Sequence, residues 1–145
     1  MKIQIKKINQ QAILPQKMTE NAAGYDIYSC HEENIILHSG EVKLIPAGLA
    51  ISLPIGFEAQ IRPRSGLAVK HQIGVLNSPG TIDADYRGEI KIILFNFGKK
   101  DFVIKPQTRI AQMVISKHET VEFELTEKLD NTSRGEGGFG HTDLG

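Results

Sequence analysis

The chain has 145 residues, of which 40% are hydrophobic and 23% are charged. Its 17 Lys and Arg residues balance its 17 Asp and Glu residues, so the formal net charge is zero. A length near 150 residues predicts one domain, and this composition excludes disorder throughout, which needs low hydrophobicity and high net charge. Neutrality gives no general attraction to nucleic acid or membranes, so we expect neither as a partner. A local basic cluster remains open as a site for small anions.

The N-terminal residues 1–7 alternate polar and apolar side chains and contain no continuous apolar segment of signal-peptide length. No apolar run approaches the roughly 18 residues that a membrane-spanning helix needs. Cys30 is the only cysteine, which excludes an intrachain disulfide and a thiolate zinc cluster. We therefore expect a soluble, cytoplasmic protein.

Glycine and proline turns divide the rest of the chain at short intervals. Gly40, Gly48 and Gly56 are spaced eight residues apart, and further turn signals follow at 78–80 and 98–99. Short strands between regularly spaced turns are typical of an all-β sandwich or barrel.

Four segments have the patterns of strands. Residues 57–62 and 121–125 alternate polar and apolar side chains, residues 89–95 begin with alternation and become apolar, and residues 109–115 are mostly apolar. No window of eleven or more residues carries a helical apolar repeat. We predict an all-β fold with one short helical turn around residues 67–70.

The last segment is rich in glycine, with four glycines in residues 134–140. Ordering glycine costs backbone entropy, so we predict a single domain over residues 1–145 with a flexible tail from about residue 126 to 145. Three of these glycines match G-x-G-x-x-G, but no strand–turn–helix unit surrounds them, which excludes a dinucleotide site. Arg134 and Phe139 suit a flap that clamps a phosphate and stacks on a base.

Residues 80–89 place Asp83, Asp85 and Tyr86 between a Pro-Gly turn and an apolar strand. A carboxylate in this loop can orient and deprotonate a water molecule. The same residues suit a polar hairpin loop in which aspartate forms the turn, and the pattern alone favours that interpretation. Two carboxylates without histidine spacing are weak support for a metal site.

Residues 62–68 combine two arginines, Ser65 and Gly66 at the start of the expected helical turn. Arginine forks and free N–H groups at a helix start can cradle a phosphate. An arginine at the end of a strand followed by a serine N-cap explains the pattern equally well. The five histidines are scattered without metal-ligand spacing.

Five segments in this order resemble the five motifs of the homotrimeric dUTP pyrophosphatase (dUTPase) family. They are residues 22–27 (AAGYDI), 63–68 (PRSGLA), 80–89 (GTIDADYRGE), 109–112 (RIAQ) and 134–140 (RGEGGFG). The resemblance implies a jelly-roll-like β-sandwich or barrel of the β-clip type. It also implies Mg²⁺-dependent hydrolysis of dUTP to dUMP and pyrophosphate, which limits uracil in DNA and supplies dUMP for thymidylate synthesis. The enzyme would be a homotrimer with shared active sites.

The resemblance also assigns roles around the nucleoside. Asp83 matches the carboxylate that activates the water attacking the α-phosphorus. Tyr86 matches the ring that packs beneath the deoxyribose and leaves no room for a 2′-hydroxyl. The uracil-reading pocket would be formed by Asn77, Thr81, Ile82 and the main chain near Lys91.

A second set of roles concerns the phosphates. Arg64, Ser65 and Gly66 match the triphosphate-binding segment, and Gln112 matches a polar contact on the phosphate side. Asp26 matches a carboxylate that orients Arg64 and the water shell of Mg²⁺, an ion held mainly by the substrate phosphates. The tail residues expected over the closed site are Arg134, Phe139 and Gly140.

The chain departs from the family pattern at two places. His141 replaces the small hydroxyl residue usual after the final Phe-Gly, and residues 106–108 replace the usual Gly and polar or acidic residue before Arg109. Two other functions stay open, a dCTP deaminase of the same broad fold and a non-catalytic nucleotide binder. The Tyr86 motif and the tail favour the hydrolase over the deaminase, and Asp83 argues against a simple binder.

Overall fold

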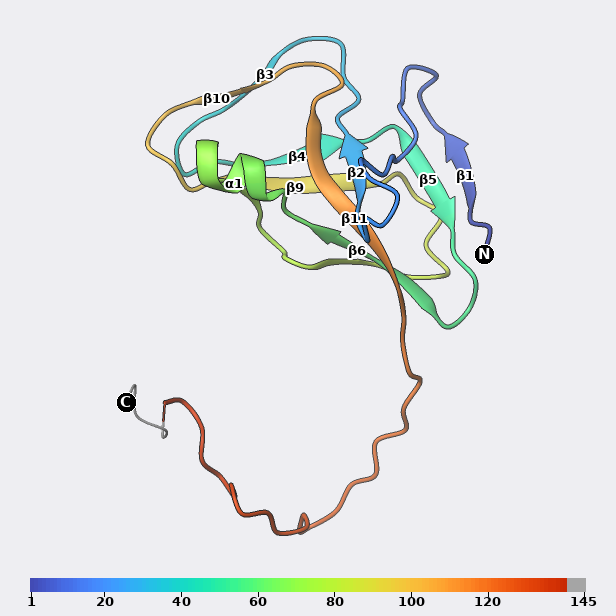
Figure 1. The fold of residues 1–145 in the computed structure, drawn as a ribbon, viewed down its shortest axis with the longest axis vertical. Coiled ribbons are helices and arrows are strands. Elements are labelled where there is room, and N and C mark those ends of the chain that lie inside the picture. Colours follow the sequence, from blue (N-terminus) through green and yellow to red (C-terminus); the bar gives the residue numbers. More distant parts are fainter. Residues whose placement is uncertain (141–145) are drawn as a thin grey trace.

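The computed structural model describes residues 1–140. Their elements are β1 (Gln4–Lys7), β2 (Tyr25–Tyr28), β3 (Ile35–Leu37), β4 (Val42–Pro46), β5 (Leu49–Ser52), β6 (Phe57–Arg62), α1 (Ser65–His71), β7 (Ile73–Val75), β8 (Gly80–Ile82), β9 (Lys91–Asn96), β10 (Phe102–Ile104) and β11 (Arg109–Lys117). The prediction of an all-β fold with one short helical turn is confirmed for this part of the chain (Figure 1). The helix extends beyond the expected residues 67–70 on both sides.

Antiparallel pairing joins these strands into four open sheets. The largest has the order β2-β11-β6-β8, and a three-stranded sheet has the order β4-β9-β7. Strand β1 pairs with β5, and β3 pairs with β10. Neighbours such as β2 and β11 are far apart in the sequence but side by side in space (Figure 1). This arrangement is that of a β-sandwich of the clip type.

Strand β6 illustrates how alternation creates the core. Ala59 and Ile61 are buried, whereas Arg62, at the end of the strand, is exposed, because successive side chains point to opposite faces. Ile61 lies opposite Met113 of β11, so the inner face of the large sheet is apolar. The large sheet also contributes Ile27 and Ile110 to the core, and the other sheets complete it with Leu37, Ile45, Ile73, Ile92, Leu94 and Ile104.

The turn at Gly48 connects several segments that are distant in sequence. Its φ of +67° favours glycine, and an added Cβ would lie 2.7 Å from the Cys30 sulfur and 2.9 Å from the Ala12 Cβ. The Gly48 carbonyl accepts a hydrogen bond from the Ile8 N–H at 2.8 Å, and its own N–H donates to the Glu89 carboxylate at 3.1 Å. Burial raises the pKa of the Cys30 thiol beside this turn, so the thiol stays neutral near pH 7.

Three of the four predicted strands are confirmed, one with the expected bounds and two with shifted ends. Residues 57–62 form β6 as expected, and the strand expected at 109–115 continues to Lys117 as β11. The strand expected at 89–95 begins at Lys91, because Ile90 instead forms hydrogen bonds with Ala47 and Leu49.

The strand prediction for residues 121–125 is wrong. This segment has no strand partner in the described part of the chain, and Phe123 and Leu125 are almost fully exposed. Alternation suits a strand, but backbone N–H and C=O groups form a sheet only where a neighbouring strand completes their hydrogen bonds.

After β11 the chain leaves the body and continues without helix or strand to residue 140 (Figure 1). No helix within residues 1–140 has the length and apolar character needed to cross a membrane.

Candidate active site

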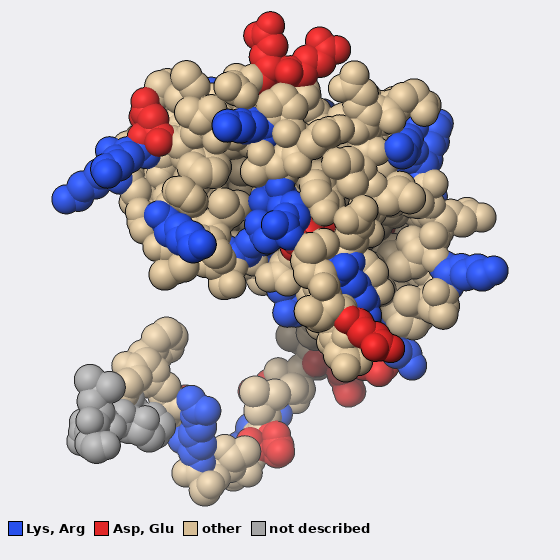
Figure 2. Space-filling model, turned by 45° about the horizontal axis from the view of Figure 1, so that its top comes forward, with Lys and Arg blue, Asp and Glu red and all other residues tan. Residues whose placement is uncertain are grey.

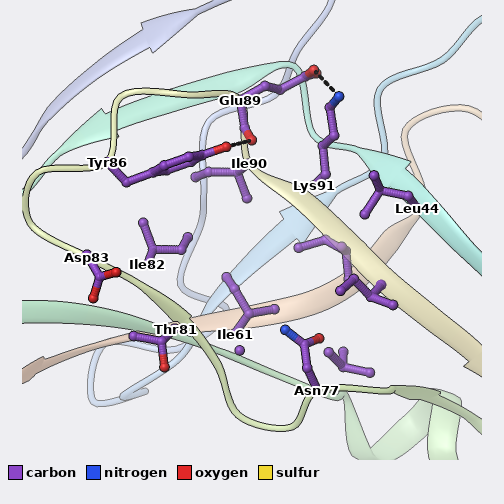
Figure 3. Close-up of a pocket in the computed structure, with 14 residues that line it drawn as sticks. Leu44, Ile61, Asn77, Thr81, Ile82, Asp83, Tyr86, Glu89, Ile90 and Lys91 are labelled. Carbon is purple, nitrogen blue, oxygen red and sulfur yellow. Dashed lines mark hydrogen bonds and ion pairs between the residues drawn. The ribbon is translucent and has the colours of Figure 1, made fainter.

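A cavity of about 370 Å³ opens beside the connection from β8 to β9 (Figure 3). Its walls come from β4, β6, β7, β8 and β9, so both the large sheet and the three-stranded sheet contribute to it. All six residues predicted to contact the nucleoside line it, namely Asn77, Thr81, Ile82, Asp83, Tyr86 and Lys91. Apolar side chains complete the lining: Leu44, Ile61, Val75, Ile90, Ile92 and Ile93.

The loop that follows β8 positions Asp83 and Tyr86 at the mouth of the cavity (Figure 3). The Tyr86 N–H donates to the Asp83 carbonyl at 3.1 Å, which closes a turn between them. The Tyr86 hydroxyl donates to the Glu89 carbonyl at 3.0 Å. The ring lies so close to Gly88 that an added Cβ would collide with it, so the loop needs glycine there. Asp83 is exposed, and its carboxylate makes no hydrogen bond or ion pair with the described residues.

The remaining predicted nucleoside contacts differ in how they meet the cavity. Asn77 points into it, whereas the Thr81 side chain points away, since Thr81 lies opposite Gln60 on the outer face of the large sheet (Figure 3). Ile82 is buried in the wall. The Lys91 ammonium lies at the rim, 3.8 Å from the Glu89 carboxylate (Figure 3). The Lys91 side chain therefore points away from the cavity, and its main chain is the part that remains beside it.

A second cluster of predicted residues surrounds Asp26 on the large sheet. The Asp26 side chain is largely buried, and its two oxygens accept hydrogen bonds from Arg64 Nε at 3.1 Å and from an Arg109 terminal nitrogen at 3.2 Å. Arg64 also donates to the Arg109 carbonyl at 3.2 Å. The Asp26 carboxylate therefore holds the guanidinium of Arg64 and neutralises part of the local positive charge.

Helix α1 begins beside this cluster. Arg64 occupies the N-cap position and makes no side-chain cap, and Ser65 and Gly66 are the first helical residues. The alternative interpretation of Ser65 as an N-cap is therefore wrong. Gln112 donates from its amide to the Pro63 carbonyl at 2.9 Å, which ties β11 to the chain just before the helix.

The residues predicted to bind phosphate lie outside the cavity predicted to bind the nucleoside. None of Arg64, Ser65, Gly66 and Gln112 lines the cavity. Figure 2 shows a group of Lys and Arg side chains at the centre of one face, with acidic side chains mainly at its margins. A neutral chain thus presents locally positive surface, as a polyanionic ligand requires.

The predicted tail residues lie apart from both clusters. Arg134 donates to the Gly137 carbonyl at 2.7 Å within its own turn, and the Phe139 side chain is fully exposed. Gly140 is the last described residue, and His141 lies outside the described residues. The structure therefore does not bring Arg134, Phe139 and Gly140 to the site of their own chain (Figure 1).

The described residues contain no group of three His, Cys, Asp or Glu side chains able to hold a metal ion. Asp26 is already paired with two guanidiniums, which makes it a poor direct ligand for a cation. Mg²⁺ bound here would therefore take most of its ligands from elsewhere, and substrate phosphate oxygens are of the hard oxygen type that it prefers.

Three residues that help to form the candidate site receive no role from the sequence alone. Arg109 belongs to a quoted motif but was given no role, although it shares Asp26 with Arg64. Glu89 closes a motif and anchors the loop around Tyr86. Leu44 reaches the cavity from β4, and its sequence position carries no signal, because only strand pairing brings it there.

Comparison with known proteins adds a family assignment. A family model for dUTPase matches residues 10–143. A Rickettsia felis protein named deoxyuridine 5′-triphosphate nucleotidohydrolase is 58% identical over 141 residues, which are 97% of this chain and 95% of that one. The structure of the Staphylococcus bacteriophage 80alpha dUTPase with dUpNHpp is 27% identical, covers 99% of both chains and has a TM-score of 0.85.

A mutant dUTPase of phage phi11 of S. aureus, described with a structural Mg(II) ion, shares the fold. It is 24% identical with a TM-score of 0.81, and the match covers 90% of this chain and 100% of that one. The sequence motifs, the loop geometry and the family model agree, and the chain belongs to the dUTPase family.

Proposed function

We propose that this protein hydrolyses dUTP to dUMP and pyrophosphate. The observation that carries the proposal is the cavity beside β8 and β9. Its lining includes the Asp83 carboxylate, which has no partner among the described residues, and Tyr86, whose hydroxyl is held by the Glu89 carbonyl. The family membership and the 58% identity to a deoxyuridine triphosphate nucleotidohydrolase support the same reaction. The reaction limits uracil in DNA and supplies dUMP for thymidylate synthesis, and we propose the cytoplasm as its location.

The cavity suits a uracil nucleoside in chemistry and shape. Asn77 offers an amide with one acceptor and two donor hydrogens, and the main chains near Ile82 and Lys91 offer further groups for the base edge. A tight apolar wall beside the base would exclude a thymine methyl group, and the apolar side chains of the lining are suited to form it. The face of the Tyr86 ring would pack beneath deoxyribose and exclude a 2′-hydroxyl, so ribonucleotides bind less well.

In the proposed reaction Asp83 acts as the general base. Its carboxylate takes a proton from water while the water oxygen attacks the α-phosphorus. The bond from that phosphorus to the bridging oxygen breaks, and pyrophosphate leaves with the bond electrons. Because Asp83 has no hydrogen-bond donor among the described side chains, its oxygens are free for water.

The phosphates would bind to Arg64, Ser65, Gly66 and Gln112. The ion pair with Asp26 holds the Arg64 fork in place before substrate arrives, so less side-chain entropy is lost on binding. Bound Mg²⁺ would supply charge neutralisation on the triphosphate, with the phosphates as its main ligands and Asp26 touching its water shell.

We propose a homotrimer in which each active site draws on more than one copy. Within one chain the nucleoside cavity and the phosphate residues are separate, and the tail carrying Arg134 and Phe139 runs away from both. The outer face of the β4-β9-β7 sheet supports assembly, because it exposes apolar side chains beside the cavity. They are Val42, Leu44 and Leu76, together with Phe97 at its end.

The test is release of pyrophosphate by the purified protein from dUTP, dTTP, dCTP and UTP, with and without Mg²⁺. We expect turnover of dUTP with Mg²⁺, with the other three substrates at least about tenfold slower, since a base or sugar that does not match the pocket costs roughly 1–3 kcal/mol. Ammonia release from dCTP would instead indicate a deaminase. Binding of dUTP without any product would indicate a nucleotide binder, and either result would overturn the proposal.

A further inference from the structure

We propose that Glu89 is a positioning residue that fixes the Tyr86 ring and so sets the preference for deoxyribose over ribose. The inference rests on the proposed function, in particular on the role of the Tyr86 ring. It assigns a role to a side chain that contacts neither the base nor the phosphates in the scheme above. Glu89 lines the rim of the cavity rather than its floor (Figure 3).

The ring of Tyr86 depends on the position of the Glu89 peptide. Tyr86 is 46% exposed, so packing holds the ring from one side only, where it rests against Gly88. Its hydroxyl donates at 3.0 Å to the Glu89 carbonyl, and among the described residues this is the hydroxyl's one hydrogen bond. A shift of that carbonyl would therefore move the far end of the ring.

The Glu89 side chain in turn ties this peptide to the body of the protein. One carboxylate oxygen accepts the Gly48 N–H at 3.1 Å, and the Glu89 side chain is only 24% exposed. Gly48 is a firm anchor, since Cys30 and Ala12 leave no space beside it. The Ile90 N–H, which belongs to the same peptide group as the Glu89 carbonyl, donates to the Leu49 carbonyl at 2.8 Å. The Glu89 carboxylate adds a second tether to this peptide, from the side that faces Gly48.

The same carboxylate has a second partner at the rim. Its other oxygen lies 3.8 Å from the Lys91 ammonium, which Figure 3 shows turned toward Glu89 rather than into the cavity. This pair is partly exposed, so its attraction is weak. The hydrogen bond from the Gly48 N–H is therefore the contact that we expect to hold the Glu89 peptide in place. A side chain with a neutral acceptor at position 89 should preserve this hydrogen bond.

The experiment compares kcat/KM for dUTP and UTP in full-length protein carrying Glu89→Ala or Glu89→Gln. Glu89→Ala should lower the dUTP to UTP ratio about fivefold, the worth of one ordinary hydrogen bond. Glu89→Gln retains an acceptor for the Gly48 N–H and should stay within about twofold of the unmodified protein. Equal losses in the two variants, or no loss in a folded Glu89→Ala protein, would overturn the proposal.

Glu41 provides a matched control. Its carboxylate also accepts a backbone N–H, from His38 at 2.8 Å, and also pairs with a lysine two residues later, at 3.5 Å. It lies in the turn before β4 and does not line the cavity. Glu41→Ala should therefore leave the dUTP to UTP ratio unchanged, and a change equal to that of Glu89→Ala would count against a specific role of Glu89.

A second variant keeps the test valid if Glu89→Ala does not fold. Tyr86→Phe removes the hydroxyl that binds the Glu89 carbonyl and should lower the ratio to a similar extent. An unchanged ratio in Tyr86→Phe would overturn the tether. If Glu89→Ala folds, combining it with Tyr86→Phe should lower the dUTP to UTP ratio no further than either change alone. Both changes break the same chain of contacts from Tyr86 through Glu89 to Gly48.

The outcomes separate this inference from the proposed function. No pyrophosphate from dUTP with the unmodified protein would refute the function and the inference together. A lowered ratio in Tyr86→Ala beside an unchanged ratio in Glu89→Ala would retain the function and refute the inference alone.

Discussion

Asp83 and Asp26 show how two aspartates in one protein acquire different roles from their surroundings. Asp26 is largely buried, and both of its oxygens face arginine side chains. Asp83 is exposed on a loop, and its carboxylate has no partner among the described side chains. A paired carboxylate positions other groups, whereas a free one beside a cavity can accept a proton.

Replacing Asp83 by asparagine tests this difference. Asparagine has nearly the same shape but cannot take a proton, so kcat for dUTP should fall by about 10²–10⁴-fold. The affinity for dUpNHpp, measured by calorimetry, should change little. Asp85→Asn on the same exposed loop is the control and should keep full turnover, while substantial turnover in Asp83→Asn would remove Asp83 from its role as base.

At the scale of elements, the large sheet aligns residues that are distant in sequence. The register places Gln112 of β11 opposite both Asp26 of β2 and Arg62 of β6. A register shift between Arg109 and Ala111 then turns the Arg109 side chain toward Asp26. Pairing of this kind, rather than any single strand, creates the cluster around Asp26.

The same register explains what the sequence could and could not predict. Alternation was sufficient to predict β6, and the residues that the motifs single out around Asp83 line one cavity. The partnership of Asp26 with Arg109 depends on an irregular strand pair that no local pattern specifies. The failed strand at residues 121–125 has the same cause, because alternation does not reveal whether a partner strand exists.

Removing Asp26 tests the cluster at this scale. Asp26→Ala leaves two arginines without their shared partner and should cost about 1–2 kcal/mol, a moderate value because Arg109 is 42% exposed. The thermal midpoint should fall by several degrees, and KM for dUTP should rise as Arg64 loses its orientation. Asp101→Ala removes an exposed pair with His38 and should change neither quantity. Unchanged KM in Asp26→Ala would contradict a positioning role for this carboxylate.

At the scale of the whole molecule, the proposed active site is divided among distant parts. Three sets of residues lie apart within one chain: the lining of the cavity, the cluster around Asp26, and the tail with Arg134 and Phe139. Residues 131–140 alone, if fully extended, can reach roughly 33 Å, at about 3.3 Å each. A tail of this length can close over a site on another copy and exclude water there.

Two inactive variants, one without the tail and one without Asp83, should together regain dUTP hydrolysis. A chain truncated after Ser133 should fold and assemble but lose most turnover, because the site no longer closes. An Asp83→Asn chain keeps its tail but lacks the base. In co-expressed mixed trimers, the tail of the Asp83→Asn chain can close over a truncated neighbour that carries an intact Asp83. Pyrophosphate release from dUTP should therefore reappear in the mixture.

The activity of the co-expressed mixture shows whether a tail closes over the site of its own chain or over that of a neighbour. If each tail closed over its own site, every mixed trimer would contain only sites that lack either Asp83 or the tail, and the mixture would stay inactive. Mixing the separately purified proteins without subunit exchange is the control and should give no activity. Unchanged kcat/KM in the truncated protein alone would contradict tail closure, and activity restricted to co-expressed chains would establish sharing between copies.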